Sequence, residues 1–184
     1  LGQGLQVVWR QTETLIDSKP SGVIQVKDCD FVDCSMEPGD RAAYPLSIFD
    51  TGGHDVILRR VKVWDTDRSP VWRNSRTGEL CRSHGAVLLE GAADKRLSIK
   101  HLSSLLLDPD RPGVKVRGFS EMVWEGADLQ IESRHGRPYR VDIECPKGVL
   151  KDFTGSFEIK LNGNLVRWNG QGELSWGLGN DCEA

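Results

Sequence analysis

The stretch DVILRRVKVWD, residues 55–65, sets apolar side chains at alternating positions on either side of a two-residue step. Alternation with a period of two places those side chains on one face of a strand. We interpret the two-residue step as a bend at which the chain turns a corner and starts a new strand. The same pattern recurs in GVIQVKDCDFVDC, residues 22–34, and again in residues 97–104. The apolar positions are Val56, Leu58, Val61 and Val63, then Ile24, Val26, Cys29 and Phe31, then Leu97, Ile99 and Leu102, with Ser104 at the fourth place.

A second pair of apolar residues precedes each bent stretch at a fixed distance. Leu46 and Ile48 stand ten and eight residues before Val56, and the same distances separate Val87 and Leu89 from Leu97. Residues 46–63 and 87–104 therefore resemble two copies of one unit, 41 positions apart. Two looser copies follow: Val114 and Val116 with Leu129 and Ile131, and Val141 and Ile143 with Phe157, Ile159 and Leu161.

Short repeated strands separated by Gly and Asp corners are typical of a solenoid, in which each unit buries its apolar face only against its neighbours. Stacking at about 4.8 Å pairs every backbone group with the units above and below. We therefore predict an all-β fold: a right-handed parallel β-helix over residues 22–160. It would follow a lead-in segment, 1–21, and end in an antiparallel cap and tail, 161–184, built around the turn Asn162-Gly163.

Residues 22–34 and 55–65 resemble coils of the pectin-lyase-like β-helix superfamily. That superfamily includes polysaccharide lyases, polygalacturonases and the tailspikes and tail fibres of bacteriophages. The resemblance implies a fold and no particular activity, because no catalytic motif of the superfamily matches residue by residue. It implies a homotrimer or larger assembly, with a polysaccharide or cell-surface glycan as partner.

Composition limits the partners, location and cofactors that we expect. The chain of 184 residues carries 24 basic and 27 acidic residues, a near balance that argues against a nucleic-acid partner. We expect no membrane span, since no apolar run approaches about 20 residues. No signal peptide is apparent at Leu1 to Arg10, and we expect a virion or cell-surface location. The five cysteines lack zinc spacing, so we expect no cofactor, although Ca²⁺ could bind aspartates at a corner.

The long loop, residues 64–85, interrupts the repeats and is the natural place for a site, because insertions in a solenoid gather on one face. Asp65 and Asp67 could act as general acid and base in glycoside hydrolysis, or could be ordinary turn residues. His84 and Arg73, with His54 and Arg82 nearby, could supply the base and the cation that a lyase needs, or could be solvated side chains.

Trp64 and Trp72 are the candidate ligand-binding residues, because exposed tryptophans stack on sugar rings. The alternative is that they pack beneath the long loop. The leading hypothesis is a structural or adhesive segment of a phage tail or surface appendage, which binds glycans or braces an assembly. A polysaccharide-degrading lyase or glycoside hydrolase is the alternative, and a scaffold without a ligand is a third possibility.

Overall fold

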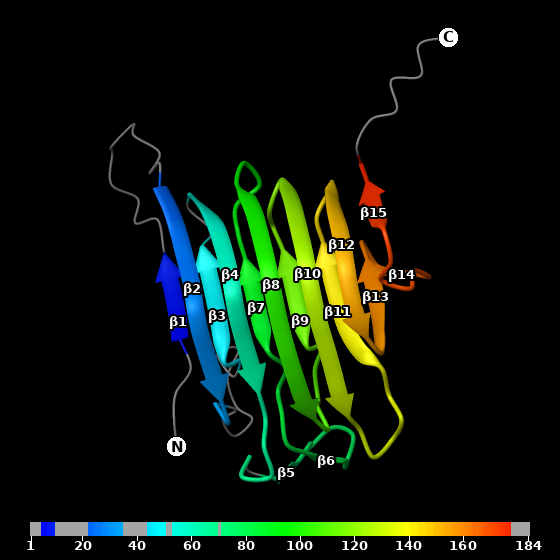
Figure 1. Ribbon diagram of the computed structural model, residues 1–184. Coiled ribbons are helices and arrows are strands. Elements are labelled where there is room, and N and C mark those ends of the chain that lie inside the picture. The colour runs from blue at the N-terminus through cyan, green and yellow to red at the C-terminus, as the bar shows by residue number, and fades with distance from the viewer. Residues whose placement is uncertain (1–4, 10–21, 35–43, 51–52, 70, 178–184) are drawn as a thin grey trace.

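The structure is a computed structural model that describes residues 5–9, 22–34, 44–50, 53–69 and 71–177, and in them every regular element is a β-strand. The strands form two large sheets and one small one (Figure 1). Sheet A contains, in order, β1 (Leu5–Trp9), β3 (Leu46–Asp50), β7 (Val87–Glu90), β9 (Val114–Arg117), β11 (Tyr139–Glu144), β13 (Phe157–Leu161) and β14 (Asn164–Val166). Sheet B contains β15 (Glu173–Trp176), β12 (Gly148–Gly155), β10 (Glu121–Glu132), β8 (Arg96–Leu107), β4 (His54–Trp64) and β2 (Gly22–Val32).

The chain alternates between the two large sheets. From β1 to β4, and again from β7 to β12, each strand of sheet A is followed in sequence by a strand of sheet B. Neighbouring strands of these two sheets run parallel, except for β14 and β15 at the C-terminal side. The predicted all-β class is confirmed, with parallel sheets.

The register confirms the repeat that was read from the sequence. Leu46 pairs with Val87 and Val56 pairs with Leu97, so the two predicted copies are neighbours at an offset of 41 residues. Residues 24–31 pair in the same way with 56–63. Because parallel neighbours stack like on like, equal positions of successive units lie beside one another.

The two looser copies were aligned wrongly. In the third unit the partners of Leu97 and Ile99 are Met122 and Trp124, so the second strand begins well before Leu129. In the fourth unit Ile159 pairs with Val141 within sheet A, and the sheet B strand is β12 instead. In the first two units the paired rows of sheets A and B begin ten residues apart, whereas Val114 and Met122 are eight apart in the third. The prediction used the later pair Leu129 and Ile131, which lies beyond the bend of β10 at Gly126.

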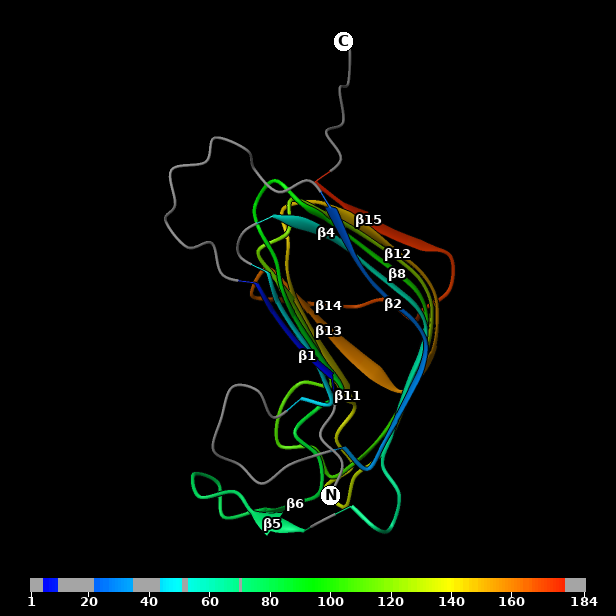
Figure 2. The same cartoon turned by 90° about the vertical axis from the view of Figure 1, so that its left-hand side faces the viewer.

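Each long strand of sheet B bends at one residue with a positive φ. These residues lie at equivalent positions of neighbouring strands: Asp28, Arg60, His101, Gly126 and Asp152. The predicted bend at the two-residue step is therefore present, but the expected start of a new strand is not, since hydrogen bonding continues on both sides. Figure 2 shows the resulting curvature of sheet B opposite sheet A.

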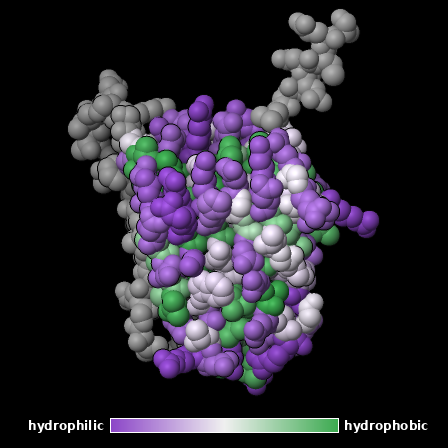
Figure 3. Space-filling model, viewed as in Figure 1, coloured by the Kyte–Doolittle hydropathy of each residue, from purple (hydrophilic) through white to green (hydrophobic). Residues whose placement is uncertain are grey.

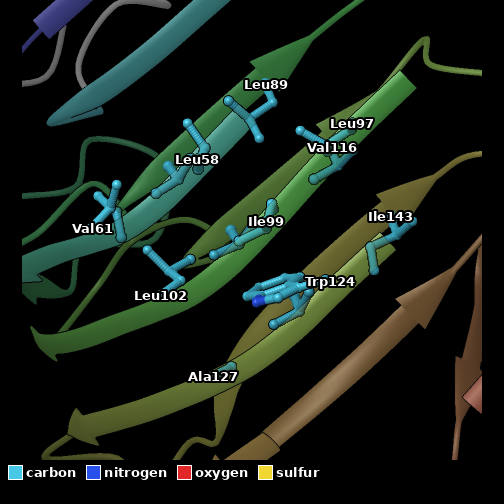
Figure 4. Close-up of a cluster of buried hydrophobic side chains, with 14 of the residues drawn as sticks. Leu58, Val61, Leu89, Leu97, Ile99, Leu102, Val116, Trp124, Ala127 and Ile143 are labelled. Atoms are coloured by element: carbon cyan, nitrogen blue, oxygen red, sulfur yellow. The ribbon is translucent and has the colours of Figure 1, made fainter. Parts of the chain in front are cut away.

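The core lies between the two sheets. Leu58, Ile99 and Trp124 from sheet B are each fully buried. Figure 4 shows these side chains with Leu89, Val116 and Ile143 from sheet A in the space between the ribbons. The outward positions of sheet B are mainly polar, and Figure 3 shows hydrophilic residues spread over this face with smaller hydrophobic areas among them. Burial of the inward rows is the main favourable contribution to the fold.

The C-terminal side ends in antiparallel strands. β13 and β14 form the predicted hairpin, and its turn residues Asn162 and Gly163 have φ of 47° and 87°, as the Asn-Gly turn requires. β15 does not join this hairpin but pairs antiparallel with β12 in sheet B. In the described part of the predicted cap, residues 161–177, β14 therefore belongs to sheet A and β15 to sheet B.

The long loop is a structured excursion. Trp64 is the last residue of β4, and the loop contains a small antiparallel pair, β5 (Trp72–Arg73) and β6 (Leu80–Cys81). Figure 2 shows this pair at one end of the molecule, beyond the ends of both large sheets. The long loop thus gives this end a surface that the other units do not have.

Candidate functional site

An open groove of about 590 Å³ lies beside the long loop, and we name it the loop-end groove. Its lining comes from three stretches: the long loop, the end of β8 and the end of β10 with the turn that follows. The lining residues are Asp67, Arg82, Leu107, Asp108, Ile131, Glu132, Ser133 and Arg134.

Asp108 and Arg134 form an ion pair in the lining of the groove. Asp108 follows β8 with a φ of 42°, a conformation that aspartate tolerates better than most residues. Its carboxylate accepts a hydrogen bond from the backbone N–H of Arg134 at 2.8 Å and one from Arg134 Nε at 2.6 Å. Arg134 also donates from Nη2 to the carbonyl of Leu80 at 3.3 Å, which ties the long loop to the turn after β10.

A second ion pair strengthens the same link. The guanidinium of Arg137 donates to both carboxylate oxygens of Glu79. This pair lowers the pKa of Glu79, chiefly through the hydrogen bonds. The Arg137 side chain is about half exposed and that of Glu79 about a quarter. We therefore expect the pair to connect the long loop to the turn after β10 while adding little to the free energy of unfolding.

The groove presents groups suited to a polyhydroxyl ligand. Carboxylates accept hydrogen bonds from hydroxyl groups, guanidiniums donate to them, and aliphatic side chains cover C–H surfaces. All three kinds are present in Asp67, Arg82 and Leu107. Tryptophan and tyrosine are absent from the described lining, so any binding there would rest on hydrogen bonds and aliphatic contact.

The two predicted catalytic aspartates are not equivalent. Asp65 is only 3% exposed and accepts hydrogen bonds from Ser83 Oγ and from the backbone N–H of Leu107. Burial raises the pKa of Asp65 to about 6. Asp67 is exposed and lines the loop-end groove. One carboxyl group is therefore inside the protein and the other is on its surface.

His84 and Trp72 are buried together. The side chain of His84 has no exposed surface, and its Nδ1 lies 3.0 Å from Asp110 Oδ1. The rings of Trp72 and His84 lie 4.5 Å apart between centroids, with 31° between their planes. His84 Nε2 and Trp72 Nε1 have no hydrogen-bond partner among the described residues. Trp72 thus takes the alternative position, packed beneath the long loop, and not that of an exposed sugar platform.

The remaining predicted residues lie at the surface or close to it. Arg73 is exposed and donates from Nη1 to the carbonyl of Gly78 at 2.6 Å, within its own hairpin. Trp64 is partly buried, and its carbonyl accepts a hydrogen bond from the N–H of Asp33 at 2.9 Å. Neither residue belongs to the lining of the loop-end groove.

The sequence prediction missed Asp108 and Arg134, although it placed the site at the long loop. Their contact joins residues 26 positions apart in different units, which no local pattern reveals. A usable signal was the stretch RHGRPYR, residues 134–140, where three arginines follow one another closely.

Two further observations concern cofactors and membranes. Within the described ranges, no three His, Cys, Asp or Glu side chains are grouped so that they could hold a metal ion. The described part of the chain likewise contains no helix long and apolar enough to cross a membrane.

Comparison with protein-family models, with curated proteins and with solved structures found no match to this chain.

Proposed function

We propose that this chain is a right-handed parallel β-helix that serves as a structural or adhesive segment of a phage tail or similar surface appendage, located in a virion or at a cell surface. The alternation of the chain between two parallel sheets supports the β-helix, because each strand of one sheet would then belong to one coil. The inward rows of apolar residues, repeated from unit to unit, support it as well.

The loop-end groove is the proposed glycan-binding site. The single observation that carries this proposal is the lining itself, which sets Asp67, Arg82 and Leu107 along one open groove. Hydroxyl groups on adjacent sugar carbons could bridge the carboxylates and guanidiniums, and Leu107 and Ile131 could contact the sugar C–H groups.

The first experiment is a glycan array on the purified chain, run beside a reducing-end assay on bacterial capsule and pectin-like polysaccharides. We expect binding without release of reducing ends. Arg82→Ala should weaken binding at least tenfold, whereas Arg59→Ala, on the exposed outward side of β4, should leave it unchanged. Absence of binding to any glycan would overturn the adhesive role and leave a scaffold.

Release of reducing ends would instead support the alternative, a polysaccharide lyase or glycoside hydrolase. The observation in its favour is that the carboxylates of Asp67, Asp108 and Glu132 line one groove. In that case Asp67→Ala should abolish cleavage and Asp65→Asn should not, because Asp65 is buried.

Assembly as a homotrimer belongs to the same proposal. The two large sheets offer broad lateral faces for self-association (Figure 1). Light scattering coupled to size-exclusion chromatography would test this, and a strictly monomeric chain at high concentration would contradict it.

A further inference from the structure

Three corners of the fold meet in a small buried group of polar side chains, which we name the Asp65 cluster. It contains Asp65 and Ser69 at the start of the long loop, Ser83 near the end of that loop, Asp33 after β2, and the backbone of Leu107 at the end of β8. Asp65, Ser69 and Ser83 are each at most 3% exposed. The cluster therefore joins the two ends of the long loop to the units on either side.

One oxygen of Asp65 faces Ser83 and Leu107. Ser83 Oγ contacts Asp65 Oδ2 and also lies 3.1 Å from the carbonyl oxygen of Leu107. The N–H of Leu107 is 3.3 Å from Asp65 Oδ2 and 3.2 Å from Ser83 Oγ. The Ser83 hydroxyl thus has two acceptors beside it and only one proton to give.

The other oxygen of Asp65 faces Ser69. Ser69 Oγ is 3.4 Å from Asp65 Oδ1 and 2.6 Å from Asp33 Oδ1. The Asp33 carboxylate also accepts hydrogen bonds from the N–H and the hydroxyl of Thr66, each at 2.6 Å. The Ser69 hydroxyl stands between two carboxyl groups, again with one proton.

The two carboxyl groups compete for one serine proton. Asp65 Oδ2 has the N–H of Leu107 beside it and Asp33 Oδ1 has the N–H of Thr66, but among the described residues Asp65 Oδ1 faces only the Ser69 hydroxyl. If both carboxyl groups are ionised and Ser69 donates to Asp33, its nearer partner, Asp65 Oδ1 is left without a donor. A proton on Asp65 Oδ1 removes this single deficit, because the neutral carboxyl group can donate to Ser69 while Ser69 donates to Asp33. An unsatisfied acceptor in a buried site is costly, so the geometry favours the neutral form of Asp65.

The surroundings act in the same direction. Among the described residues no lysine or arginine forms an ion pair with Asp65. The charge of Asp33 disfavours a second negative charge there, while Arg68 acts on Asp33. The other titratable neighbours are Cys34 and Tyr139, both with raised pKa values that burial mainly causes. Burial is likewise the largest cause of the raised pKa of Asp65.

We propose that the Asp65 cluster is a pH-sensitive latch for the long loop. With Asp65 neutral, Ser69 and Ser83 hold both ends of the loop against the neighbouring units. With Asp65 ionised, the buried Asp65 carboxylate and the partly buried Asp33 carboxylate share the Ser69 hydroxyl, and the loop opens to hydrate Asp65. The loop carries Asp67 and Arg82, so opening would also change the loop-end groove.

Hydrogen exchange of the full chain at pH 5.0 and pH 7.5, expressed as protection relative to intrinsic rates, tests the latch. Peptides that cover residues 65–69 and 105–108 report on it, since they contain the N–H groups of Asp65, Ser69 and Leu107. A pKa that moves from about 6 in the closed loop to 3.8 in the open loop makes opening about tenfold more frequent at pH 7.5. Peptides from β8 and β10 outside the cluster should show no such change.

Asp65→Asn is the decisive variant, because its amide can accept from Ser83 and donate to Ser69 without titrating. It should show the same protection at both pH values, whereas Asp67→Asn, on the exposed part of the same loop, should behave as the unmodified protein. If Asp65→Asn retained the pH dependence, a different group would be responsible and the latch would be wrong. Asp33→Asn gives an independent check: loss of one negative charge should lower the pKa of Asp65, so the difference in protection between pH 5.0 and pH 7.5 should shrink, and an unchanged difference would also overturn the proposal. Neither result depends on whether a glycan binds.

Discussion

The interior of this protein has two regions of opposite character. Between the sheets, Leu58, Ile99 and Trp124 lie in adjacent strands and pack without exposed surface. At the corner below the long loop, the buried groups are Asp65 and its serine partners. Leu, Ile and Trp side chains do not titrate, and their packing depends on their size and spacing. The polar corner, in contrast, is stable only when its hydrogen bonds and charges are satisfied. Substitutions in the two regions should therefore differ in the size of their effect on stability and in its dependence on pH.

Removal of a side chain from the apolar rows should have the largest effect. Ile99 is fully buried between Leu58 and Trp124 in register, so Ile99→Ala leaves a cavity that both neighbouring units line. We expect the free energy of unfolding to fall by about 3 kcal/mol, measured by urea denaturation. A loss below about 1 kcal/mol would mean that the interior packs loosely and that the contrast is overstated.

The polar corner should make the stability of the protein depend on pH. The pKa of Asp65 is raised in the folded protein, so its contribution is fully present below pH 3.8 and is lost as the pH rises through about 6. The shift corresponds to at most about 3 kcal/mol between these limits. Urea denaturation from pH 4 to pH 7.5 should show this decline in the unmodified protein and much less of it in Asp65→Asn. The Ile99→Ala loss should be the same at both pH values.

A substitution at the bend of sheet B should reduce stability by an intermediate amount. Gly126 has a φ of 77°, and an added Cβ would approach His101 Nδ1 to 2.7 Å. Gly126→Ala should therefore destabilise by about 1–2 kcal/mol, from the left-handed backbone and the displaced imidazole. Thermal unfolding followed by circular dichroism would measure it. His101→Gly in the same background should restore part of the loss, and failure to do so would argue against the steric explanation.

A substitution on the outward face of sheet B should change the stability least. Lys100 Nζ lies 3.4 Å from Glu125 Oε2, and both side chains are about half exposed. Lys100→Ala should change the free energy of unfolding by less than about 1 kcal/mol, with the small effect fading further in high salt. This variant is also the matched control for Ile99→Ala, because the two residues are adjacent on β8 and point to opposite faces.

Much of the fold could be predicted because its pattern is local. The alternation in Val56, Leu58, Val61 and Val63 identified the inward face and the bend, and the structure pairs that stretch as expected with Leu97–Ser104. The prediction failed in the third unit because it took Leu129 and Ile131 for the first apolar pair of the strand, although these residues lie beyond the bend of β10 and Met122 and Trp124 precede it. The Asn162-Gly163 hairpin was predictable from two adjacent residues whose conformational preference is strong.

The site was predictable in place but not in detail. The long loop stood out because it interrupts the repeats, and the loop-end groove does lie against it. Which of Asp65 and Asp67 is buried could not be read from the sequence, since both follow the same strand two residues apart. The groove depends on Arg134 and Asp108, whose contact exists only because successive units place their corners side by side.

The inward side chains of β2, β4 and β8 and the position at which each of these strands bends could be read from the sequence, because strand periodicity and the preferences of turn residues act between near neighbours. The burial of Asp65, its sharing of Ser69 with Asp33 and the lining of the loop-end groove followed only from the packing of the strands in three dimensions. These depend on residues about a unit apart along the chain, and parallel stacking of the strands brings them into contact.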